Sequence, residues 1–226
     1  MADDLAALLD VPAIAARFGI DAEGRPRLAA WMRGAGIRWG LDATHRAGLA
    51  LSACGPQNTA LFGVDRMLMG YAVGRAPSGQ EAPYAGIEPY DEVGGLDAAL
   101  AGGFARLVER LVRWQADSTS PASPADWAGR LRALVADLTQ PVDEADRKTL
   151  AALDDALKNW LDACAEAGFD AVLPLSVVAD AWLAELVQTW DAVNTAWRQR
   201  VLQFGQSSQL SLLEQLGFDS PRWQQL

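Results

Sequence analysis

The stretch LDAALAGGFARLVERLVRW, residues 96–114, decides the fold. Its apolar residues recur every three or four positions, which is the spacing of one buried face on an α-helix. The members of this stripe are Leu96, Leu100, Phe104, Leu107, Leu111 and Trp114. Similar stripes follow in residues 127–138, 150–164 and 183–201, so we expect an all-α chain whose second half is a bundle of long helices.

Four regions are expected along the chain. They are a small N-terminal helical head over residues 1–73, a loop rich in glycine and proline over residues 74–95, the helical bundle over residues 96–204, and a short C-terminal helical tail over residues 205–226. A loop as long as the second region is usually functional or disordered in a compact domain. In the tail, the last helix is expected over residues 208–216.

Local signals place the elements of the head. Pro12 suits the first turn of a short helix, Asp21 can cap the next helix, and Thr59 opens a longer one. Residues 42–57 have the composition of a loop, and Ile37–Trp39 alternates as one short β-strand would. The helix that follows Thr59 carries apolar residues near one face, namely Leu61, Phe62, Val64, Leu68 and Tyr71.

Signals of the same kind mark the helices of the bundle. Ser123 and Asp126 resemble a capping box around Pro124. Gly168 is expected to end the third long helix, and Ser176 to cap the fourth.

The charge of the chain is unevenly distributed. The formal net charge of the 226 residues is −10, whereas residues 17–75 carry a net charge of +4 and the remainder −14. An acidic chain does not attract free nucleic acid as a whole, so any contact with nucleic acid should come from residues 17–75 and should be weak. The body of the bundle would repel phosphate.

Several function classes are excluded by residue counts. Neither of the two lysines, Lys148 and Lys158, follows a glycine, so the chain holds no P-loop for ATP hydrolysis. His45 is the only histidine, which excludes a multi-histidine metal site. The sequence contains no run of about 18 apolar residues, which is the length that a helix needs to span a membrane. The acidic start of the chain is unlike a signal peptide, so we expect a cytoplasmic protein without a cofactor.

Two groups of residues have the chemistry of a catalytic site. Asp42 and His45, with Cys54 nearby, are the residue types of a nucleophile and its base, but a loop fixes no geometry between them. Asp143, Asp146 and Lys148 are the residue types of a metal-dependent nuclease, but they fall on the first turn of a helix, where acids favour the helix dipole. We therefore interpret both groups as structural and expect no catalytic residues.

Arg38 and Trp39 form the best candidate contact with nucleic acid, because an arginine beside an aromatic ring can hold a phosphate or stack on a base. For Trp39 we favour the alternative that it is buried, because buried tryptophan is common. Arg46 and Arg66 complete the set that we would test for DNA binding, although Arg66 could instead pair with a neighbouring acid. Most of the other tryptophans lie at the spacing of a helical core, namely Trp114, Trp127, Trp160, Trp190 and Trp197.

The strings Gly36-Ile37-Arg38-Trp39-Gly40 and Phe62-Gly63-Val64-Asp65-Arg66-Met67-Leu68-Met69-Gly70-Tyr71-Ala72 resemble the RecC family, the gamma subunit of exodeoxyribonuclease V (RecBCD). The resemblance covers about residues 5–183 and returns at Pro89-Tyr90-Asp91 and Val172-Leu173-Pro174-Leu175-Ser176. After about Leu183 the tail weakly resembles a segment of transglutaminase-like membrane proteins of the TgpA type.

The resemblance implies a noncatalytic piece of a much longer subunit. In RecC, a helicase-like fold without ATPase motifs holds the RecB and RecD motor subunits and guides DNA during double-strand break repair and recombination. RecB-like and RecD-like partners, a scaffold role and weak DNA binding are therefore expected here. The alternative is a stand-alone helical module that binds only protein.

Overall fold

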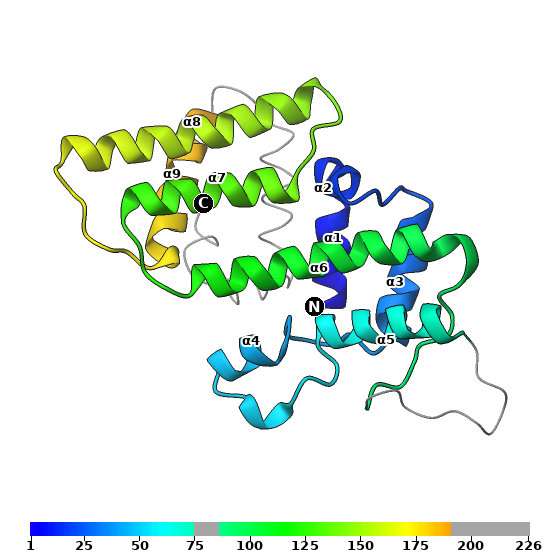
Figure 1. Cartoon of the computed structure of the whole chain (residues 1–226). Coiled ribbons are helices and arrows are strands. Elements are labelled where there is room, and N and C mark those ends of the chain that lie inside the picture. Colours follow the sequence, from blue (N-terminus) through cyan, green and yellow to red (C-terminus); the bar gives the residue numbers. More distant parts are fainter. Residues whose placement is uncertain (75–85, 191–226) are drawn as a thin grey trace. The chain divides into compact units, whose positions relative to one another are not determined.

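The computed structural model describes residues 1–74 and 86–190. Helices dominate the described chain, which contains no β-strand, and this confirms the all-α class (Figure 1). An isolated bridge joins Ala122 and Leu173 through two backbone hydrogen bonds of 3.1 and 2.8 Å. The elements follow in this order: α1 Ala2–Leu9, α2 Pro12–Arg17, α3 Gly24–Gly34, α4 Ala43–Gly48, η1 Ser52–Cys54, α5 Ala60–Val73, η2 Gly95–Asp97, α6 Ala98–Ser118, α7 Pro124–Leu138, α8 Glu144–Glu166 and α9 Leu175–Trp190.

The described residues form two compact units. The first contains Met1–Ala116 and Leu138–Gln140, and the second contains Asp117–Asp137 and the described residues from Pro141 onward. Most of α6 therefore clusters with the N-terminal helices. The division into head, loop, bundle and tail stays a prediction about domains. Trp197, the helix expected over residues 208–216 and the whole tail lie outside the described residues.

The core of the first unit is built around α6, as the apolar stripe predicted. Phe104 and Leu107 are 0% exposed, and Leu111 and Trp114 are also buried. The helices and connecting segments before α6 supply the other buried residues of this core. Among them are Leu5, Leu9, Phe18, Leu28, Trp31, Met32, Ile37, Leu41, Val64, Met67 and Tyr90.

Most helix boundaries follow the expected caps, but Ser176 does not cap α9, because that helix already begins at Leu175. Pro12 is the first residue of α2, and the Asp21 carboxylate accepts a hydrogen bond of 2.7 Å from the N–H of Gly24. Thr59 caps α5 through a bond of 3.2 Å from the N–H of Phe62. Ser123 accepts a bond of 3.2 Å from the N–H of Asp126 and donates to the carboxylate of the same residue.

Two expectations for the head are wrong. Ile37–Trp39 is not a strand: the N–H groups of Arg38 and Trp39 both donate to the carbonyl of Asn58, at 3.0 and 3.3 Å. Left-handed backbone at Gly36 and Gly40 turns the chain on either side, which prevents an extended segment. Residues 42–57 are not a plain loop, because they contain α4 and η1. The alternation therefore reflected burial of Ile37 and not strand pairing.

The apolar residues of α5 do not share one environment. Leu68 is 39% exposed and Tyr71 is 46% exposed, whereas Ala60, Gly63 and Gly70 are buried. The physical reason is close backbone approach. A Cβ atom on Gly70 would collide with the carbonyl of Tyr90, and only the absence of a side chain permits that contact.

The second unit consists of α7, α8 and α9, and α8 packs against α9 (Figure 1). Two buried tryptophans anchor it. The indole N–H of Trp127 donates to the carbonyl of Leu173 at 2.7 Å, and that of Trp182 donates to the carbonyl of Leu153 at 2.9 Å. Trp160 is buried as predicted. Gly168 follows the end of α8 with a φ of 62°, as expected for a residue just beyond a helix.

Candidate nucleic-acid interface

Arg46 on α4 organises the loop that carries the candidate residues. Its side chain is buried, with the residue only 2% exposed. It donates hydrogen bonds to the carbonyls of Gly55 at 2.8 Å, Gln57 at 2.7 Å and Trp39 at 2.8 Å. The guanidinium also lies over the Trp39 ring, 4.3 Å from the ring centroid. Arg46 therefore joins residue 39 to residues 55–57 and does not present its charge to solvent.

The backbone around Arg46 is shaped to admit it. Gly40 has a φ of 76°, and a Cβ atom there would lie 2.9 Å from Nε of Arg46. Asp42 caps α4 by accepting a bond of 2.7 Å from the N–H of His45. Nδ1 of the buried His45 accepts a bond of 3.1 Å from the N–H of Leu41. These contacts give Asp42 and His45 structural roles, while Cys54 is exposed on η1.

Arg66 on α5 also has a structural role. Its Nε donates to the carbonyl of Glu88 and its Nη1 to that of Ala35, both at 2.8 Å. The Glu88 carboxylate lies 3.8 Å from the guanidinium. Arg66 thus ties the end of α3 to the segment that precedes Tyr90, and the expected ion pair is confirmed.

Tyr90 fixes that segment between two helices. Its ring lies where a Cβ atom on Gly34 would be, and its N–H donates to the carbonyl of Arg66 at 2.9 Å. The hydroxyl donates to the Glu92 carboxylate at 2.6 Å. Burial, followed by this bond to Glu92, raises the pKa of the Tyr90 hydroxyl above its usual value. The Pro89-Tyr90-Asp91 string is therefore a packing element.

Arg38 is the exposed guanidinium among the four candidates. Its Nη1 lies 3.2 Å from the carbonyl of Arg33 and 3.4 Å from that of Ile37, at the end of α3. Trp39 beside it is half-buried. Arg33 is also exposed and was missed at the sequence level. Its position in the last turn of α3, five residues before Arg38, was the available signal. Because Arg46 and Arg66 are occupied by backbone carbonyls, the side chains that a ligand could reach are Arg33, Arg38 and the solvent-accessible part of Trp39.

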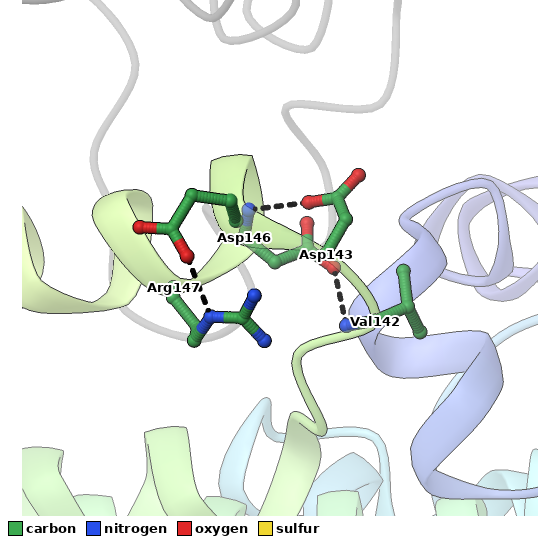
Figure 2. A network of polar contacts seen from close by, with 5 residues as sticks. Val142, Asp143, Asp146 and Arg147 are labelled. Atoms are coloured by element: carbon green, nitrogen blue, oxygen red, sulfur yellow. Dashed lines mark hydrogen bonds and ion pairs between the residues drawn. The ribbon is translucent and has the colours of Figure 1, made fainter.

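Figure 2 shows the acidic start of α8, which resembled half of a nuclease site. The Asp143 carboxylate accepts a bond of 2.8 Å from the N–H of Asp146, and the Asp146 carboxylate accepts one of 3.0 Å from the N–H of Val142. Arg147 pairs with Glu144 at 2.9 Å. This is a reciprocal helix cap. Across residues 1–74 and 86–190, no group of three metal-ligating side chains occurs.

No helix in the described part of the chain is long and apolar enough to cross a membrane.

Comparison with known proteins gives the chain its family. Residues 1–189 match the family model described as the fourth domain of the RecBCD enzyme subunit RecC. RecC of Escherichia coli strain K12 is 36% identical over 201 residues, which are 88% of this chain and 17% of that protein. RecC of Mycobacterium tuberculosis H37Rv is 36% identical over 113 residues, or 49% of this chain and 10% of the relative. RecC of Buchnera aphidicola is 26% identical over 160 residues, which are 71% of this chain and 14% of that protein.

The chain is therefore a helical domain of a kind found in a subunit of the RecBCD enzyme. It belongs to the RecC family. The chain spans about a sixth of the length of its Escherichia coli relative. The strings that carried the resemblance contain Gly40, Gly63, Arg66 and Gly70, and close packing accounts for each of them. The resemblance of the tail to TgpA-type proteins stays a prediction.

Proposed function

We propose that this chain serves as a noncatalytic part of a RecC-like subunit, in a RecBCD-type helicase–nuclease that acts in double-strand break repair and recombination. The observation that carries the proposal is the match of residues 1–189 to the RecC fourth domain. Its role is that of a scaffold that contacts RecB-like and RecD-like motor subunits in the cytoplasm. The structural use of Asp42, Asp143 and Asp146 as helix caps supports a noncatalytic role.

A DNA-guiding role is the second part of the proposal. Residues 17–75 carry a net charge of +4 in an acidic chain, and Arg33 and Arg38 are exposed there. Trp39 offers an aromatic surface beside them, and such a pairing suits an unpaired strand, whose bases can stack while arginines hold the phosphates. Arg46 and Arg66 hold the backbone of this surface in place through hydrogen bonds to the carbonyls of Trp39 and Ala35.

Co-purification tests the assembly role. The tagged chain is expressed with Escherichia coli RecB and RecD, and the bound proteins are identified after washing at moderate salt. Capture of either motor subunit supports the proposal. A chain that captures neither, while circular dichroism shows it to be folded, would contradict it and leave the stand-alone interaction module as the better account.

A further inference from the structure

Helix α5 turns its small residues inward. Ala60, Gly63 and Gly70 are buried, and a Cβ atom on Gly63 would collide with the side chain of Ile37. Val64 and Met67 are buried beside them, whereas the other large apolar residues of the helix are partly or largely open to solvent. We define the Asp65 face as Asp65 and five apolar residues of α5 that are not fully buried, although Leu61 among them also packs partly against the core: Leu61, Phe62, Leu68, Met69 and Tyr71.

Asp65 lies in the middle of this face. On a helix surface, the neighbours of a residue are those three and four positions away. For Asp65 all four are large and apolar, namely Leu61, Phe62, Leu68 and Met69. The carboxylate is half-buried and makes no hydrogen bond or ion pair with another described residue. Burial raises its pKa above the usual value.

A half-buried carboxylate among apolar side chains would be stabilised by a cationic partner. Burying charge without a partner costs free energy, and apolar side chains around a charge exclude water from any pair that forms there. The exposed Leu68 and Tyr71 supply apolar contact beside it. Nucleic acid does not fit, because Asp65 would repel phosphate. A second copy of the chain in a symmetric pair does not fit either, because it would bring Asp65 toward its own like charge.

We propose that the Asp65 face is the docking surface for a segment from another part of a RecC-like subunit, which packs apolar side chains on Leu68 and Tyr71 and sets an arginine against Asp65. This inference rests on the proposed function. Arginine suits the position because its guanidinium group is weakly hydrated and forms ion pairs at partly buried sites.

The size of the face favours a partner within the same subunit. A helix of 14 residues is about 21 Å long, so one face offers roughly 200–300 Å². A stable interface between separate proteins buries about 800 Å² on each side. A segment of the same subunit needs less area, because linkage holds it at a high effective concentration. The match covers 17% of Escherichia coli RecC, which leaves most of that protein to supply such a segment.

Binding in trans tests the inference. The full chain is titrated against Escherichia coli RecC that lacks the matched stretch and has been purified with RecB and RecD bound, which reports that it is folded. Two face variants, Leu68→Asp and Asp65→Arg, are compared with Val172→Asp, which alters an exposed valine of the second unit. Thermal melting confirms that each variant is folded.

We expect the two face variants to bind at least tenfold more weakly than the unchanged chain, and Val172→Asp to bind within twofold of it. Equal binding by all four proteins overturns the inference. Absence of binding by the unchanged chain overturns it as well. In both cases the proposed function is judged separately, by capture of RecB or RecD in the co-purification experiment.

Discussion

The guanidinium of Arg46 lies over the indole ring of Trp39, 4.3 Å from its centroid, and donates a hydrogen bond to the carbonyl of the same residue. One buried cation thus holds both the side chain and the backbone of an aromatic residue that is itself half-buried. The arrangement separates two roles that the sequence placed together. The buried Arg46 fixes the backbone of the candidate interface, whereas Arg38 and part of Trp39 are accessible to a ligand.

Removing Arg46 should destabilise the fold. Arg46→Met leaves the carbonyls of Trp39, Gly55 and Gln57 without their donor, and unsatisfied buried groups cost about 1–3 kcal/mol each. We expect a loss of at least about 2 kcal/mol in urea unfolding. The matched control is Arg38→Met, which removes an exposed guanidinium and should change stability by less than about 0.5 kcal/mol. Equal losses in both variants would contradict the structural role of Arg46.

Adding one methyl group to α5 should have an effect of opposite sign to the same change in α7. Gly70→Ala forces a Cβ atom into the carbonyl of Tyr90 and should cost about 1–3 kcal/mol or more. Gly129→Ala meets open space on an exposed helical position and should stabilise by roughly 0.5–1 kcal/mol. Chemical denaturation of the two variants checks the signs. A stabilising Gly70→Ala would show that Tyr90 does not pack against α5.

Truncation of a fully buried aromatic residue of α6 should be costly. Phe104 is 0% exposed, and Phe104→Ala should lower the free energy of unfolding by about 3–5 kcal/mol. Urea melts followed by circular dichroism measure the loss. Leu68→Ala, on the exposed flank of α5, serves as control and should cost less than about 1 kcal/mol. A small loss for Phe104→Ala would mean that the stripe lies at a surface.

The Asp65 carboxylate should make stability depend on pH. Because burial raises its folded-state pKa above the unfolded value, the native state favours the protonated form. The native fold is therefore penalised as pH rises through the folded-state pKa. Asp65→Asn should raise the free energy of unfolding at pH 7 and leave it nearly unchanged at pH 2.5. Urea melts at the two pH values give the comparison, and a variant less stable than the wild type at pH 7 would refute the sign.

Any DNA binding should depend on Arg33 and Arg38. Two neutralised phosphates give a slope of only about −1.8 in log K against log salt, so binding should be weak and detectable at low salt. Titration of a forked DNA with Arg33→Ala/Arg38→Ala should show a loss, while Arg113→Ala, an exposed arginine of α6, should not. Equal binding by the double variant would remove the DNA-guiding part of the proposed function.

The sequence predicted the long helices better than the details of the head. Periodicity found α6 because Phe104, Leu107 and Leu111 repeat over several turns, and the caps at Thr59 and Ser123 are local chemistry that needs no tertiary context. The outward turn of Leu68 and Tyr71 could not be foreseen. It depends on how closely Gly63 and Gly70 approach Ile37 and Tyr90, and those contacts join residues far apart in the chain.

The candidate interface was predicted only as a set of residue types. Arginine beside tryptophan signalled possible contact with nucleic acid, but nothing in the spacing separates the buried Arg46 from the exposed Arg38. That difference arises because the segments on either side of α4 bring three backbone carbonyls to the Arg46 guanidinium: those of Trp39, Gly55 and Gln57.

The three hydrogen bonds of Arg46 also define a natural place for engineering. They close the base of a hairpin-like excursion whose tip, Leu51 to Cys54, is exposed. A peptide tag or a small reporter domain inserted at Ser52 would leave that base intact. Cys54 on the tip is open to maleimide reagents, whereas burial raises the pKa of the Cys164 thiol and slows its reaction. A fluorophore should therefore attach to this loop in preference to α8, a short distance along the chain from Trp39.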